Sequence, residues 1–102
     1  MTNPIQKEIL KRAKFEYPGH TEFLAALCGE KTKPVMLLAS DQLLVVPVTI
    51  HEPLSNVPNI LTEQLLVQTI LIAERALKTD FSINKPRLCV SGLNPHAGEN
   101  GT

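Results

Sequence analysis

The stretch that most directly predicts the class of fold lies near the end of the chain: Arg87-Leu88-Cys89-Val90-Ser91-Gly92-Leu93-Asn94-Pro95-His96-Ala97-Gly98-Glu99-Asn100-Gly101. Its first four residues form a short apolar run that predicts a buried strand. The remainder is a Gly/Asn/Pro loop with one histidine, and α/β folds commonly present ligating side chains in such loops at a strand's carboxyl end. His96 is therefore the first candidate functional residue. The alternative is a solvated turn histidine.

Two further histidines also lie at predicted element boundaries. His20 stands in Pro18-Gly19-His20-Thr21-Glu22, and His51 stands in Thr49-Ile50-His51-Glu52-Pro53-Leu54. If the three boundaries face the same side of a sheet, the imidazoles converge. The plainer alternatives are a hydrogen-bonded histidine at a strand end for His51 and helix capping for His20 and Thr21. Free amides at that helix start would also favour an anionic ligand.

Composition limits the classes of partner. The 102 residues suit one modest domain, and the ten basic and ten acidic residues cancel, so we expect no nucleic-acid partner. No apolar run reaches the length needed to cross a bilayer and the N-terminus has no secretory pattern, so we expect a cytoplasmic protein without a membrane partner. Cys28 and Cys89 have no paired spacing and are expected to be reduced core residues.

The first half of the chain predicts two helices and a hairpin. Asn3-Pro4 is a good helix start, and a second helix should open at His20 or Thr21 and end at Gly29. Two β-like runs, residues 35–39 and 43–50, are separated by Ser40-Asp41-Gln42 and predict a hairpin. Pro47 cannot donate to a ladder, which makes the second run an edge strand or places a bulge in it.

The second half predicts one long helix. Residues 53–58 read as a loop, after which Thr62 caps a helix that extends to Lys78. One face carries an apolar stripe at helical spacing, and four more apolar residues widen it. This breadth predicts a deeply buried helix or one that packs against another subunit. The stripe is Leu66, Ile70, Ala73 and Leu77, and the additional residues are Leu65, Val67, Leu71 and Ile72.

Three separated blocks resemble one family, the NAD-dependent 4-hydroxythreonine-4-phosphate dehydrogenases of pyridoxal phosphate biosynthesis. They are Pro18–Phe23, Thr49–Leu54 and Gly92–Glu99, and Thr2–Glu8 is similar to the block just upstream. The resemblance implies that residues 1–102 are a single partial domain, the middle segment of a longer dehydrogenase whose N- and C-terminal parts are missing. It also implies an α/β fold, a partial isocitrate/isopropylmalate dehydrogenase-like fold with three layers, a mixed sheet and a β-hairpin.

The resemblance also implies roles for four residues. His20 and Thr21 match the family's substrate-contacting pair, and His51 and His96 match two of its three ligands for a divalent metal ion such as zinc, magnesium or cobalt. The third ligand has no counterpart here, and most of the NAD-binding surface is absent, so no catalytic or cofactor-binding residue is assigned. Glu52 departs from the apolar residue expected in its block.

The implied function is metal-assisted oxidation of a secondary alcohol in a small phosphorylated amino acid, followed by decarboxylation to 3-amino-2-oxopropyl phosphate. Family members are dimers, which implies a homodimer. Two alternatives stay open. In the first alternative the chain is a catalytically inactive truncated fragment. In the second it is an interaction module that docks on a complementary chain. On any of these readings we expect the isolated chain to be inactive, because a metal site with two histidines is incomplete.

Overall fold

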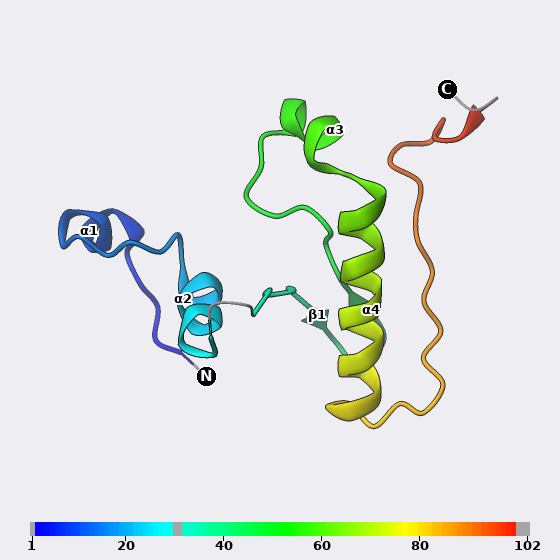
Figure 1. Cartoon of the computed structure of the whole chain (residues 1–102), viewed down its shortest axis with the longest axis horizontal. Coiled ribbons are helices and arrows are strands. Elements are labelled where there is room, and N and C mark those ends of the chain that lie inside the picture. The colour runs from blue at the N-terminus through cyan, green and yellow to red at the C-terminus, as the bar shows by residue number, and fades with distance from the viewer. Residues whose placement is uncertain (1, 30–31, 100–102) are drawn as a thin grey trace. The chain divides into compact units, whose positions relative to one another are not determined.

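The structure, a computed structural model, describes residues 2–29 and 32–99. The chain divides into two compact units, Met1–Pro47 and Val48–Thr102, called here the first and second units. The element order is two helices, a two-stranded hairpin, a short 3-10 turn and two more helices (Figure 1). Among the described residues, no helix is both long and apolar enough to span a bilayer.

Helix α1 is shorter than the sequence predicts. It spans Lys7–Arg12, and its N-cap is Gln6, without a side-chain cap. The predicted start at Asn3-Pro4 is therefore wrong. Ile5 lines the same shallow hollow as Phe15 and Tyr17, and the residues before Lys7 are not helical. The non-helical segment before Lys7 places Ile5 at this hollow, which gives a physical reason for the later start.

The end of α1 is a Schellman motif with a lysine in the left-handed position. Lys14 has a φ of 61°, and its N–H donates to the Lys11 carbonyl at 3.0 Å. The Phe15 N–H donates to the Leu10 carbonyl at 2.9 Å. These two bonds satisfy carbonyls that a helix end leaves unpaired. The motif also turns Phe15 toward the start of the next helix.

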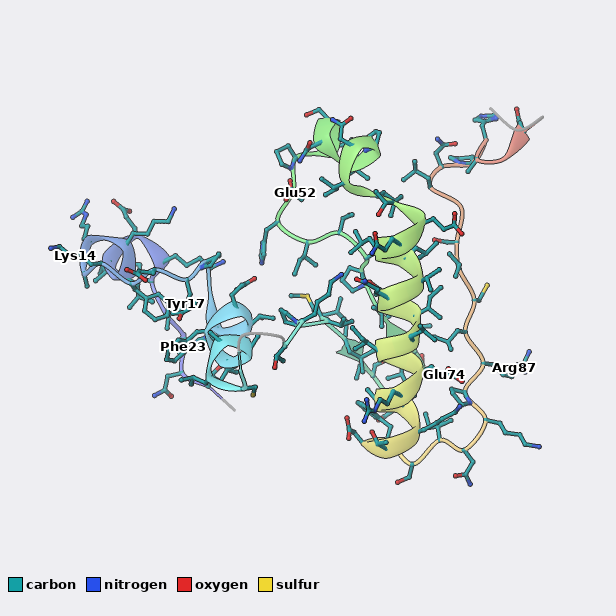
Figure 2. The ribbon with its side chains drawn as sticks, viewed as in Figure 1. Lys14, Tyr17, Phe23, Glu52, Glu74 and Arg87 are labelled. Carbon is teal, nitrogen blue, oxygen red and sulfur yellow. The ribbon has the colours of Figure 1, made fainter. Side chains whose placement is uncertain are left out.

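Three aromatic rings connect α1 to α2, which spans His20–Leu27. Phe15, Tyr17 and Phe23 have ring centroids 5.3 to 5.6 Å apart in edge-on or tilted pairs (Figure 2). Such geometry is favoured by the ring quadrupoles. Helix α2 begins at His20, and Gly29 follows its end with a φ of 123°, so both predicted limits are confirmed.

The predicted hairpin is present but short. Strands β1 (Leu38–Ala39) and β2 (Leu44–Val45) pair antiparallel, with Leu38 opposite Val45. The Ser40 N–H donates to the Leu43 carbonyl at 2.9 Å, and the Ser40 hydroxyl also bonds there at 3.1 Å. Strand β2 ends two residues before Pro47, which has no N–H to extend the ladder.

The predicted loop at 53–58 is largely helical, so that prediction is wrong. A 3-10 turn, η1, covers Leu54–Asn56, and a single helical turn, α3, covers Val57–Ile60. Pro58 lies in the first turn of α3, where its missing N–H would have no intrahelical acceptor. A proline therefore marks a helix start here, where the sequence pattern alone indicated a break.

Helix α4 confirms the long predicted helix within one residue at each end. It spans Glu63–Thr79, and the Thr62 hydroxyl oxygen accepts from the Leu65 N–H at 3.2 Å. Its buried side chains are Thr69, Ala73 and Leu77, at 5%, 6% and 8% exposure. These lie at i, i+4 and i+8, on one face. Thr69 is tolerated there because its hydroxyl donates to the Leu65 carbonyl at 2.8 Å.

The predicted buried strand at residues 87–90 is neither a strand nor buried. After α4 the chain reverses and runs extended past the helix (Figure 1). Leu88 and Val90 are 43% and 57% exposed, and residues 85–93 make no backbone-to-backbone hydrogen bond with any described residue. A strand needs a neighbouring strand to pair with, and the described part of the chain supplies none at this segment.

The described residues contain one sheet, the two-stranded hairpin, together with helices on either side of it in sequence. They form a small mixed piece of helix and strand, and the three-layer arrangement with a mixed sheet is not seen in them.

Both cysteines are free and exposed, so the prediction of core cysteines is wrong. Cys28 caps the end of α2, and Cys89 lies on the exposed extended segment.

Replacing Thr62 by alanine removes the hydroxyl oxygen that caps α4. We expect the free energy of unfolding to fall by about 1 kcal/mol, since an unpaired helix-start amide then remains. Urea unfolding followed by circular dichroism measures the change. Thr62→Ser is the matched control and keeps the acceptor, so equal losses in both variants would contradict the cap.

Candidate functional site

The loop that carries His96 is folded by local hydrogen bonds. The Asn94 side-chain oxygen accepts from the His96 N–H at 2.8 Å, and the Asn94 carbonyl accepts from the Ala97 N–H at 3.1 Å. A Cβ at Gly92 would lie 3.1 Å from the Asn94 carbonyl oxygen, so the turn has little room for any larger residue. The sequence Gly-x-Asn-Pro-His-Ala therefore builds a compact turn that presents the histidine.

The His96 ring has one defined partner. Its Nδ1 lies 3.0 Å from Oε1 of Glu99, and the two side chains are 78% and 66% exposed. Gly98, between them, has a φ of 86°, a left-handed conformation that favours glycine. The sequence pattern predicts only loop scaffolding for Glu99; a carboxylate three residues after a histidine in a Gly-containing turn was the signal of its contact with the ring.

His51 occupies an unusual backbone conformation. Its φ is 57°, in the left-handed region that few non-glycine residues adopt. The residue is exposed in the bend before η1. Next to it, the Glu52 carboxylate accepts from the Asn56 side-chain amide at 2.8 Å, which ties the bend to η1. Lys14 and Ser82 have similar φ values of 61° and 57°, so the conformation of His51 does not by itself indicate a functional role.

His20 and Thr21 are the first two residues of α2, in the first unit, and both are half-buried. The N-cap is Gly19, which has no side chain to pair with the first amides. These amides and the positive end of the helix dipole suit a negatively charged group. The alternative role of Thr21 as a side-chain cap does not occur.

His51 and His96 lie in the second unit, in two different loops. In Figures 1 and 2 the bend before η1, marked by Glu52, and the C-terminal turn lie on opposite sides of α4, so the view does not bring the two loops together. Within residues 2–29 and 32–99, no three His, Cys, Asp or Glu side chains gather into a metal-binding group. The described chain therefore offers at most part of a coordination sphere.

The donors present suit part of a transition-metal site. Neutral imidazoles are good ligands for zinc and cobalt, and a carboxylate on the far ring nitrogen is the usual support for such a ligand. His96 and Glu99 provide that arrangement. A tetrahedral site needs four ligands, so two histidines require further donors from outside the described residues.

Comparison with known proteins is consistent along the whole chain. The sequence profile of the family described as "Pyridoxal phosphate biosynthetic protein PdxA" matches residues 1–102. The chain is 53% identical over 106 residues to a 4-hydroxythreonine-4-phosphate dehydrogenase from Methylorubrum extorquens, covering all of this chain and 30% of that protein. It is 55% identical over 105 residues to the protein of that name from Paracoccus denitrificans, covering 98% of this chain and 32% of that one.

A solved structure agrees. A crystal structure of 4-hydroxythreonine-4-phosphate dehydrogenase from Klebsiella pneumoniae superposes with a TM-score of 0.83 at 39% identity. The match covers 97% of this chain and 29% of that protein. The chain therefore spans about 30% of the length of the curated relatives that it matches.

Two substitutions at His51 distinguish the contribution of its imidazole ring from the contribution of its backbone conformation. We expect His51→Asn to leave the urea midpoint nearly unchanged, because asparagine tolerates the left-handed region. His51→Val should lower the free energy of unfolding by about 1–2 kcal/mol, the cost of a β-branched residue at this φ. Both variants lose the imidazole, so both should lose any zinc affinity that His51 provides. Equal midpoints for the two variants would contradict the left-handed conformation.

Proposed function

The chain belongs to the PdxA family of pyridoxal phosphate biosynthetic proteins over residues 1–102, and we propose on that basis that it provides the middle segment of an NAD-dependent 4-hydroxythreonine-4-phosphate dehydrogenase. The observation that carries this proposal is 53% identity across the full chain to a curated protein of that name. The chain spans 30% of that relative. We therefore attribute the activity to a family-length protein and not to this segment alone.

The reaction is oxidation of a secondary alcohol in a small phosphorylated amino acid, followed by loss of carbon dioxide to give 3-amino-2-oxopropyl phosphate. When bound, a divalent metal ion would stabilise negative charge on the substrate oxygen, and NAD would be the hydride acceptor. The residues of this chain bind and orient. His51 and His96 would hold the metal ion through their imidazoles, and the remaining ligand would come from another segment of a family-length protein.

The substrate-binding part is the start of α2. We assign His20 and Thr21 to contacts with substrate, since both lie in the first turn and are half-buried. Uncapped amides there favour an anionic group of the substrate. His20 and Thr21 lie in the first unit, and the two proposed metal ligands lie in the second.

The isolated 102-residue chain should form no NADH from 4-hydroxythreonine 4-phosphate and NAD, with either zinc or magnesium present. Two histidines do not complete the proposed metal site, and a hydride acceptor without its binding surface is not oriented. Absorbance of NADH measures the reaction, and the Klebsiella pneumoniae dehydrogenase is the positive control. Robust turnover by this chain alone would contradict the proposal that it is one segment of the active protein.

A second candidate function is an interaction module, favoured by the extended segment at residues 85–93. That segment has exposed Leu88 and Val90 and no backbone-to-backbone hydrogen bond within the described chain. The solved relative, of which the chain covers 29%, has a similar backbone over 97% of this chain. We propose that this edge pairs with a strand of a polypeptide carrying the rest of a family-length protein, by β-strand addition.

Co-expression tests this docking. The tagged chain is produced with the two parts of the Klebsiella pneumoniae dehydrogenase that flank the matching segment. We expect co-purification, and at least a tenfold loss with the double variant Leu88→Asp/Val90→Asp, because two charges would be buried on pairing. Leu54→Asp, at a side chain 86% exposed in the same unit, is the matched control and should bind normally. Absence of co-purification, or equal capture of the double variant, would exclude this role.

A further inference from the structure

We infer that Glu99 is a positioning residue that fixes the tautomer and orientation of His96, so that the ring presents Nε2 to a divalent cation. This inference deepens the proposed metal role of His96 and rests on it. The contact that motivates it joins His96 Nδ1 and Glu99 Oε1 at 3.0 Å. No other described histidine has a side-chain carboxylate contact of this kind among the ion pairs of the structure.

The chemistry of the pair assigns the proton. An ionised carboxylate only accepts hydrogen bonds, so Nδ1 must carry a hydrogen for the 3.0 Å contact to form. In the neutral ring the lone pair then lies on Nε2. A neutral imidazole in water prefers the opposite arrangement, with the hydrogen on Nε2. Glu99 therefore selects the tautomer in which the outer nitrogen can donate to a metal ion.

The backbone of the turn keeps the His96 and Glu99 side chains next to each other. The His96 N–H is bonded to the Asn94 side chain at 2.8 Å, and the Glu99 N–H returns to the His96 carbonyl at 3.3 Å. Gly98 supplies the left-handed step that brings Glu99 back toward the ring. All of these contacts lie within six residues, so they do not depend on the placement of distant segments.

Because the His96–Glu99 pair is exposed, its effect on the orientation of the ring can be measured apart from its effect on the free energy of unfolding. Both side chains are more than half exposed, and ion pairs in water contribute little to folding. Removing the Glu99 carboxylate should therefore change the orientation of the His96 ring with little effect on the free energy of unfolding. Loss of a carboxylate behind a ligating histidine typically weakens metal binding by about 10- to 100-fold.

Nitrogen NMR of the 102-residue chain tests the tautomer directly. At pH about 8.5, where an ordinary imidazole is neutral, long-range ¹⁵N–¹H spectra report which ring nitrogen of His96 carries the hydrogen. We expect Nδ1–H to predominate in the native chain and in Glu99→Gln, whose amide oxygen still accepts. Glu99→Ala should revert to Nε2–H, and Glu16→Ala, an exposed carboxylate outside the loop, should match the native chain. Predominant Nε2–H in the native chain, or no change in Glu99→Ala, would overturn the inference.

Titration with zinc alone tests the positioning role of Glu99 separately from the proposed metal role of His96. We expect zinc to shift the Nε2 resonance of His96 in the native chain and to bind Glu99→Ala about 10- to 100-fold more weakly. If the native tautomer is Nδ1–H but zinc never shifts Nε2, the metal role of His96 fails while Glu99 still orients the ring. If zinc binds both proteins equally, the positioning role of Glu99 is overturned and the metal role stands.

Discussion

Burial of one face of α4 is the constraint on which the second unit depends. Thr69, Ala73 and Leu77 are its buried side chains, and two of the three are small. Many large apolar residues elsewhere in the described chain remain exposed, including Leu71 on the same helix. Burial of apolar area is the main favourable term in folding, and the few buried side chains among the described residues contribute little of it. The chain spans about 30% of the length of the curated relatives that it matches.

The features that the sequence predicts well are those set by local chemistry. Helix α4 follows from its apolar spacing and from the oxygen of Thr62, and the end of α2 follows from Gly29, because each depends on residues within a few positions. The strand expected at residues 87–90 fails for the opposite reason. An apolar run becomes a strand only when another strand pairs with it, and that partner cannot be read from the run itself. The start expected at Asn3-Pro4 fails because the residues before Lys7 are not helical and place Ile5 at the hollow beside Phe15 and Tyr17. The loop expected at residues 53–58 fails because Pro58 lies in the first turn of a helix, where a proline is tolerated.

The features of the candidate site also fall into two groups, those that local sequence predicts and those that it does not. The sequence places His20 and Thr21 at a helix start, and the structure agrees, because Gly-His-Thr before an apolar pattern is a local signal. The left-handed backbone of His51 and the contact of Glu99 with His96 were not predicted. Both depend on torsion angles of individual residues, which apolar periodicity does not report. The family resemblance supplied the roles of the histidines, whereas the geometry supplied the partner of one of them.

The two exposed thiols give the molecule a further property. Cys28 belongs to the first unit and Cys89 to the second, and the 102-residue sequence contains no other cysteine. Each unit therefore carries its own native attachment point for a maleimide fluorophore, without any substitution. A donor and an acceptor dye on these sulfurs would report the separation between the units by energy transfer, and would register any change in that separation when the complementary polypeptide is added.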